Sequence, residues 1–174
     1  DKIFADKFNI ATIILKGDEV VYERYATKRK INSNTLLSGM SMSKTAASAA
    51  IGNLLCEGKI KSLDDAAGNY SATLKASPYA NIKIKNILQM NSGVSPIGRD
   101  DEKRFNQKSR GMTEKFSGEA SVRGALKFYK NAARQQNTAM NYHSTDTLAL
   151  SVLVEEISGQ SLATVFHNKI YSKF

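Results

Sequence analysis

The first part of the chain has a pattern of apolar and polar positions that predicts a β-hairpin over residues 8–26. Residues 8–16 are rich in β-branched side chains, and residues 20–26 partly alternate between apolar and polar side chains. The residues between these two segments, Lys16-Gly-Asp-Glu19, have turn-forming chemistry. The nearly continuous apolar run of the first strand indicates that both of its faces are covered.

A second pattern, over residues 41–57, predicts a helix. Its apolar residues recur at roughly helical spacing among small Ala and Ser residues, which allow close packing, and Gly58 ends the pattern. A solvated helix face would carry more charge, so we expect this helix to be buried. Cys56 lies on the pattern, and we therefore expect a buried, inert thiol there.

Further helices are expected toward the C-terminus. They are a helix within residues 82–90, preceded by a short extended piece, and helices at 122–133, 146–158 and 161–171. Thr145-Asp146 is expected to cap the third of these helices, and Gly159 to end it. Residues 99–121 are charged and contain glycine, as is typical of a long surface loop. The predicted fold class is α/β (α+β): an antiparallel hairpin at 8–26 and a helical lobe over about 35–174.

The composition narrows the possible function classes. The 174 residues suffice for one domain, and the net charge of +9 invites a nucleic-acid hypothesis. The basic residues are scattered, however, and the one tight run, residues 28–30, has no interleaved aromatic residues, so no nucleic-acid partner is expected. No apolar run approaches the length of a membrane span, so no membrane partner is expected either. One Cys and two His make a disulfide framework and a metal site unexpected, and the localisation stays open.

The predicted helix at 41–57 begins with a pair of residues that can perform nucleophilic chemistry. Ser41 and Lys44 are three positions apart, so on a helix they share one face. A serine hydroxyl becomes a good nucleophile when a neighbouring group takes its proton. A lysine amine can take that proton when it is neutral, and burial near a positively polarised helix terminus favours the neutral form. The spacing alone equally permits a capping serine followed by a solvated lysine.

Four segments in chain order resemble the serine β-lactamases, penicillin-binding proteins and related esterases. Ser41-x-x-Lys44 opening a buried helix is similar to the first motif of that family, and the text of residues 51–65 is similar to the segment that follows it. Residues 84–94 resemble a segment of the class C-like branch in which Met-x-Ser-Gly is followed by an apolar residue, here Val94. Tyr142-His-Ser144, with Ile157-Ser-Gly-Gln-Ser-Leu162 after it, resembles the Tyr-x-Asn or Tyr-x-Ser motif and its helix. The Tyr-x-Ser form is closest to the 6-aminohexanoate-dimer hydrolase and esterase-like members.

The resemblance implies a β-lactamase/transpeptidase-like fold and a role for each matching residue. Ser41 would be the acylated nucleophile, and its backbone N–H one donor of the oxyanion hole. Lys44 would accept the proton of Ser41, Tyr142 would relay protons, and Ser144 would form a hydrogen bond in that relay. No cofactor and no metal is implied, and His143 and His167 are expected to be non-catalytic.

The chain departs from the family pattern at its end. Relatives carry a third motif, of Lys-Thr-Gly or His-x-Gly type, on a later strand that also supplies the second oxyanion donor, and neither triplet occurs in this sequence. Residues 1–174 would then be the N-terminal portion of a single catalytic domain. We expect an incomplete sheet with an open edge, or one completed by a C-terminal segment or by self-association with another copy. We also expect weak activity at best for the chain alone.

The leading hypothesis is a serine hydrolase that cleaves the amide or ester bond of a small-molecule substrate through an acyl-enzyme on Ser41. The sequence does not decide whether the substrate is a linear amide, a carboxylic ester or a β-lactam. The alternatives are β-lactamase or D,D-peptidase activity, a non-catalytic penicillin-binding-like module, and a basic nucleic-acid-binding module, which the scattered charge argues against.

Overall fold

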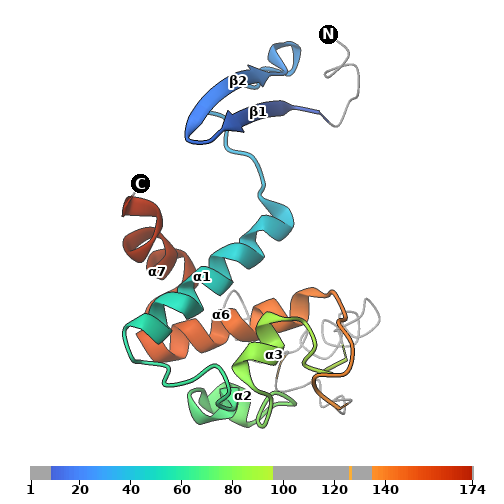
Figure 1. Ribbon diagram of the computed structural model, residues 1–174, viewed down its shortest axis with the longest axis vertical. Helices are drawn as coiled ribbons and strands as arrows, with labels where there is room; N and C mark the ends of the chain where they lie inside the picture. Colours follow the sequence, from blue (N-terminus) through green and yellow to red (C-terminus); the bar gives the residue numbers. More distant parts are fainter. Residues whose placement is uncertain (1–8, 96–125, 127–134, 174) are drawn as a thin grey trace, which may run out of the picture. The chain divides into compact units, whose positions relative to one another are not determined.

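The structure, a computed structural model, describes residues 9–95, 126 and 135–173. The chain divides into two compact units, Asp1–Met40 and Ser41–Phe174, and each is described by itself. The first contains strands and the second contains helices (Figure 1). The elements are β1 (Ala11–Lys16), β2 (Glu19–Tyr25), α1 (Ser43–Cys56), α2 (Ala72–Lys75), α3 (Ile84–Leu88), α6 (Ser144–Ser158) and α7 (Leu162–Lys169), with short 3-10 turns between them.

The first unit contains the predicted hairpin. β1 and β2 pair antiparallel, with Leu15 opposite Val20 and an irregularity in the register between Ile14 and Leu15. Gly17 in the connecting turn has a φ of +60°, which a glycine adopts without steric cost. The expectation that both faces of the first strand are covered is not met among the described residues, because the sheet there has two strands. The apolar side chains of the hairpin are therefore about half exposed: Ile13, Ile14, Leu15, Val20 and Val21.

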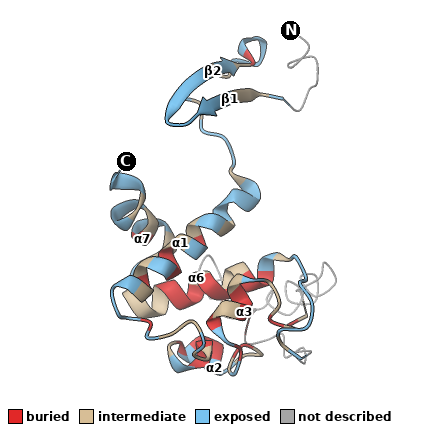
Figure 2. Cartoon of the chain, viewed as in Figure 1, coloured by how far each residue is buried: buried red, intermediate tan, exposed pale blue. Residues whose placement is uncertain are grey.

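The second unit is built on the packing of α1 against α6 and α7, with α2 and α3 also against α6. Figure 2 shows the buried positions concentrated on α6 and on the parts of α1, α2 and α3 near it. The side of α1 that packs inward consists of Ala47, Ala50, Ile51 and Leu54, at helical spacing. The small alanines let α1 and α6 approach each other closely. The sequence predicts this close packing for α1.

Cys56 is exposed, so the prediction of a buried thiol is wrong. The reason is its position on the helix. The buried positions of α1 end at Leu54, and two further residues rotate the side chain by about 200° around the axis, away from the core.

The start of α6 also differs from the prediction. The helix begins at Ser144, and its N-cap is His143, whose backbone is extended and whose side chain makes no capping hydrogen bond. Thr145 and Asp146 lie inside the first turn and are buried. Asp146 is therefore not a cap, because buried partners from elsewhere in the chain bind its carboxylate instead. Gly159 ends the helix in the left-handed conformation, as predicted.

The predicted loop at 99–121 lies outside the described residues, and so does the predicted helix at 122–133, apart from Leu126, which is helical and buried. The last predicted helix is present as α7, followed by a 3-10 turn at Tyr171–Lys173. Among the described helices, no single one has the length and apolar composition needed to cross a membrane. Taken together, α6 and the helical segment Leu162–Lys173 have that length and composition, but the two are bent by 72° relative to each other.

A glycine in the connection before α2 gives a test of this packing. A Cβ at Gly68 would stand 2.4 Å from the backbone oxygen of Ala80, whereas a Cβ at Gly52, in α1, would meet nothing within 4 Å. Gly68→Ala should therefore lower the free energy of unfolding by about 1–3 kcal/mol. Gly52→Ala should raise it by about 0.5–1 kcal/mol through helix propensity. Urea denaturation followed by circular dichroism measures both, and equal stability of the two variants would contradict this packing.

Candidate active site

Ser41 and Lys44 lie together at the start of the buried helix. Ser41 is in the 3-10 turn Met40–Met42 that leads directly into α1, and Lys44 is the second residue of α1. The Lys44 Nζ donates a hydrogen bond to the Ser41 Oγ at 3.2 Å. Ser41 is exposed and Lys44 half-buried. The hydroxyl of Ser41 and the amine of Lys44 therefore lie close together at a helix N-terminus, as predicted.

The residue before Ser41 has an unusual backbone conformation. Met40 has a φ of +44°, in the left-handed region that a residue with a side chain adopts at a cost of about 1–2 kcal/mol. Ser41, the next residue, is exposed in the turn that leads into α1.

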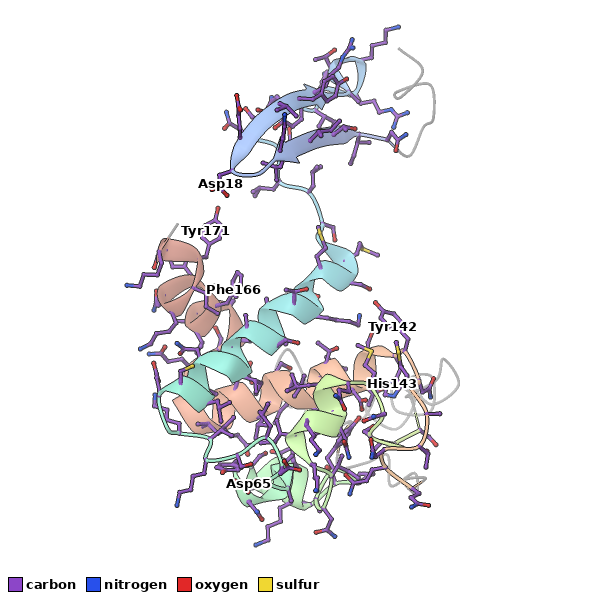
Figure 3. The ribbon with its side chains drawn as sticks, in the orientation of Figure 1. Asp18, Asp65, Tyr142, His143, Phe166 and Tyr171 are labelled. Atoms are coloured by element: carbon purple, nitrogen blue, oxygen red, sulfur yellow. The ribbon has the colours of Figure 1, made fainter. Side chains whose placement is uncertain are left out.

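Tyr142 comes from a distant part of the sequence to the same place. The Lys44 Nζ lies 5.1 Å from the centroid of the Tyr142 ring, and Tyr142 as a whole residue is 58% exposed. Hydrogen bonding to Ser41, together with the charge and hydrogen bonding of Lys44, lowers the pKa of the Tyr142 phenol against a smaller opposing effect of burial. Figure 3 shows Tyr142 and His143 at the beginning of α6. The three residues Ser41, Lys44 and Tyr142 thus form one constellation in the second unit.

Backbone hydrogen bonds hold the segment that carries Tyr142 against the end of α3. The Asn141 N–H donates to the Met90 carbonyl at 2.7 Å, and the Asn137 N–H donates to the Asn91 carbonyl at 2.9 Å. Gln136 Oε1, nearby, accepts from Asn86 Nδ2 at 2.7 Å. The sequence analysis did not single out these residues. The sequence signal near them was the family-like segment at residues 84–94, which contains Met90 and Asn91.

Ser144 is the first residue of α6 and is exposed. None of the hydrogen bonds found among the described residues joins its hydroxyl to Ser41, Lys44 or Tyr142. Its position two residues after Tyr142 keeps it at the same end of the helix. Its predicted role in a proton relay stays a prediction.

The described residues hold no group of three or more His, Cys, Asp or Glu that could bind a metal ion. His167 is exposed on α7, and its ring centroid lies 6.0 Å from that of Tyr171. His143 is different, because its side chain is only 7% exposed and its Nε2 lies 3.8 Å from Asp146 Oδ2. The three side chains that the structure brings together, those of Ser41, Lys44 and Tyr142, offer a hydroxyl, an amine and a phenol.

The sequence profile of a known family, Beta-lactamase, matches residues 5–174 of this chain. The chain belongs to the Beta-lactamase family. A search of curated proteins finds no match.

Solved structures show the same fold for the family member described here. A candidate beta-lactamase from Bacteroides dorei superposes with a TM-score of 0.73 at 18% identity, over 94% of this chain and 45% of that one. An octameric penicillin-binding protein homologue from Pyrococcus abyssi gives a TM-score of 0.71 at 22% identity, over 93% of this chain and 38% of that one. A D-stereospecific amidohydrolase from Streptomyces sp. gives a TM-score of 0.57 at 17% identity, over 75% of this chain and 39% of that one.

The fold is therefore β-lactamase-like, mixed α/β with an antiparallel sheet and helices, as the sequence predicts. This chain spans less than half the length of each of these three structures. At these identities the structural likeness establishes the fold, and the activity has to be argued from the residues of the site.

Proposed function

We propose that this chain carries the nucleophile of a serine hydrolase that cleaves amide or ester bonds through an acyl-enzyme on Ser41. The observation that carries the proposal is the hydrogen bond of 3.2 Å between Lys44 Nζ and Ser41 Oγ at the start of α1. Nucleophile and base within hydrogen-bond reach are the signature of an activated serine. Membership of the Beta-lactamase family supports the same chemistry.

Each step of the proposed reaction has a residue to perform it. The neutral Lys44 amine takes the proton of the Ser41 hydroxyl while the oxygen attacks the carbonyl carbon of the substrate. The Ser41 backbone N–H, at the N-terminus of α1, donates to the oxygen that becomes negative. The proton passes by way of Tyr142 to the leaving amine or alcohol, and the carbonyl stays bound to Ser41 as an ester. Water then attacks this ester and gives its proton to the same relay, which returns a proton to the Ser41 oxygen as its bond to the acyl carbon breaks and the acid is released.

The finer assignment of substrate rests on the Tyr142-x-Ser144 motif. We propose a 6-aminohexanoate-dimer-hydrolase-like or esterase-like activity on a small-molecule amide or ester, because a serine at 144 is the form of that branch. The alternatives are β-lactamase or D,D-peptidase activity, and a non-catalytic penicillin-binding-like module. The exposed apolar side chains of the hairpin, Ile13 and Leu15 among them, support the further proposal that a C-terminal segment or another copy covers them.

Covalent labelling tests the proposed nucleophile. The protein is incubated with a fluorophosphonate and, separately, with a fluorescent penicillin, and the adduct is located by peptide mass spectrometry. We expect the adduct on Ser41, and we expect it to be lost in Ser41→Ala and kept in the control, Ser48→Ala. Ser48 is an exposed serine of α1, and among the described residues its hydroxyl bonds only the Lys44 carbonyl. An adduct elsewhere, or none with either probe, would favour the non-catalytic alternative. p-Nitrophenyl esters, nitrocefin and short linear amides then distinguish the substrate classes.

Replacement of Tyr142 by phenylalanine tests the proton relay. In the complete enzyme, Tyr142→Phe should lower turnover by about a hundredfold or more, the scale of a lost proton-transfer group. Because the pKa of Tyr142 is lowered, the rate should rise with pH through a value below the ordinary tyrosine value, as the phenolate that receives the proton from Lys44 and passes it to the leaving group becomes populated. The Phe variant should lack this rise, whereas Tyr171→Phe, at an exposed tyrosine after α7, should keep it. Unchanged turnover in Tyr142→Phe would make Tyr142 structural.

A further inference from the structure

A cluster of buried polar side chains lies in the first turn of α6, next to Tyr142. Asp146 is fully buried, and its Oδ1 accepts hydrogen bonds from the Tyr79 hydroxyl and from the Ser92 hydroxyl, each at 2.7 Å. Tyr79 and Ser92 are themselves 1% exposed. These contacts join α6 to the segments before and after α3, so the carboxylate ties three parts of the chain together.

The second oxygen of this carboxylate faces His143. Asp146 Oδ2 has no hydrogen-bond partner among the described residues, and neither ring nitrogen of His143 has one either, although all three atoms are buried. His143 Nε2 lies 3.8 Å from Asp146 Oδ2, a few tenths of an ångström beyond a hydrogen bond. An unsatisfied buried polar group costs about 1–3 kcal/mol, so a small movement that joins the two groups is strongly favoured.

The position of His143 in the chain gives this pair its significance. Tyr142 is exposed, so packing of its own ring does not fix it at Lys44. On the N-terminal side the chain is held by the bond from Asn141 N–H to the Met90 carbonyl. On the C-terminal side the next residue is His143, which is the N-cap of α6 and makes no capping hydrogen bond. Among the described residues, the buried side chain of His143 is therefore a second anchor of the backbone beside Tyr142.

We infer that His143 and Asp146 form a buried positioning pair, in which the His143 Nε2–H donates to Asp146 Oδ2 and holds Tyr142 against Lys44 and Ser41. The role that this pair serves in catalysis rests on the proposed function, but the pair itself does not. Neither residue touches the reacting atoms, so both are positioning residues. Tyr79 and Ser92 hold the carboxylate in place from the other side.

Two variants of nearly equal shape test the pair. His143→Gln keeps a side-chain N–H close to the place of Nε2, whereas His143→Met fills a similar volume without a donor. His167→Met, at the exposed histidine of α7, is the control. The measurement is the pKa of the Tyr142 phenol by NMR of protein labelled with [13Cζ]tyrosine, with the Tyr142 signal assigned from Tyr142→Phe. This readout needs no turnover, and a change in the general stability of the fold would not move it.

We expect a Tyr142 pKa below the ordinary value in the wild type, in His143→Gln and in His167→Met. In His143→Met the phenol should leave Lys44 and Ser41, and the pKa should return to about 10. The rate of fluorophosphonate labelling of Ser41 should fall about tenfold in His143→Met and stay within about twofold in His143→Gln, the scale expected for a misplaced catalytic group. A folded His143→Met with the wild-type pKa would overturn the inference.

A measurement on the wild type keeps the inference testable if His143→Met does not fold. In an 15N–1H spectrum the His143 ring N–H should be protected from exchange and hydrogen-bonded, and a free, rapidly exchanging ring N–H would overturn the pair. The two proposals also fail separately. Absence of a Ser41 adduct in the wild type contradicts the hydrolase, and an unaltered Tyr142 pKa in His143→Met contradicts the positioning pair.

Discussion

Replacing Lys44 by methionine is expected to slow the acylation of Ser41 by about a thousandfold, within the range seen for a lost general base. The reason is the hydrogen bond of 3.2 Å between Lys44 Nζ and Ser41 Oγ, which places a basic side chain in direct contact with the hydroxyl. Without it the hydroxyl keeps its proton and is a weak nucleophile. The rate of fluorophosphonate adduct formation, followed by mass spectrometry, measures the effect directly.

Two further variants separate the base from the charge of Lys44. Lys44→Arg keeps a cation that does not give up its proton, so it should be slow as well. Lys59→Met removes an exposed lysine that pairs with Glu57 at 3.0 Å at the other end of α1, and it should label at the wild-type rate. The pKa of Tyr142 should rise in Lys44→Met, because the charge of Lys44 contributes to lowering it. Wild-type labelling in Lys44→Met would exclude Lys44 as the base.

Replacing Asp146 by leucine is expected to lower the free energy of unfolding by roughly 2–6 kcal/mol, about 1–3 kcal/mol for each of the two buried hydroxyls left without an acceptor. These hydroxyls belong to Tyr79 and Ser92, which both donate to Asp146 Oδ1 at 2.7 Å. A loss of this size is a large part of the stability of an ordinary domain. Urea denaturation followed by circular dichroism measures it.

The triple variant Tyr79→Phe, Ser92→Ala, Asp146→Leu should recover much of this loss, because it removes the unpaired donors as well as the acceptor. A Leu variant as stable as the wild type, or a triple variant less stable than the single one, would contradict the account. The comparison also distinguishes lost hydrogen bonds from a poor fit of leucine in the core.

Asp146→Asn is the matched variant that keeps an acceptor for both hydroxyls. Burial raises the pKa of the Asp146 carboxyl, against the hydrogen bonds of Tyr79 and Ser92 and the nearby His143, which lower it. A carboxyl whose pKa is raised in the folded state ionises first in the unfolded state, so the wild type loses stability as the pH rises from the ordinary aspartate value through the raised one. Asp146→Asn has no such group. Its stability relative to the wild type should therefore improve as the pH rises above the ordinary aspartate value, where the buried carboxyl of the wild type resists ionisation.

Elements that are encoded within a short stretch of sequence could be predicted, whereas features that depend on distant residues could not. The hairpin, the long helix α1 and the end of α6 at Gly159 were all predictable, because alternation, helical spacing and glycine ends are encoded within a few residues of one another. The start of α6 was not. Thr145-Asp146 looks like a cap in the sequence, yet Asp146 is bound by Tyr79 and Ser92, which lie 67 and 54 positions away.

The candidate site divides in the same way. The sequence by itself determined that Ser41 and Lys44 lie on one face of a helical turn, because three positions on a helix return a side chain to the same face, and the structure showed that the two groups form a hydrogen bond. Only the tertiary structure brought the Tyr142 ring to within 5.1 Å of the Lys44 Nζ, through the docking of its segment on the end of α3. It also placed His143 beside Asp146 in the core, where burial makes an unpaired polar group costly. Contacts within one helical turn follow from backbone geometry, whereas these contacts depend on how the chain packs.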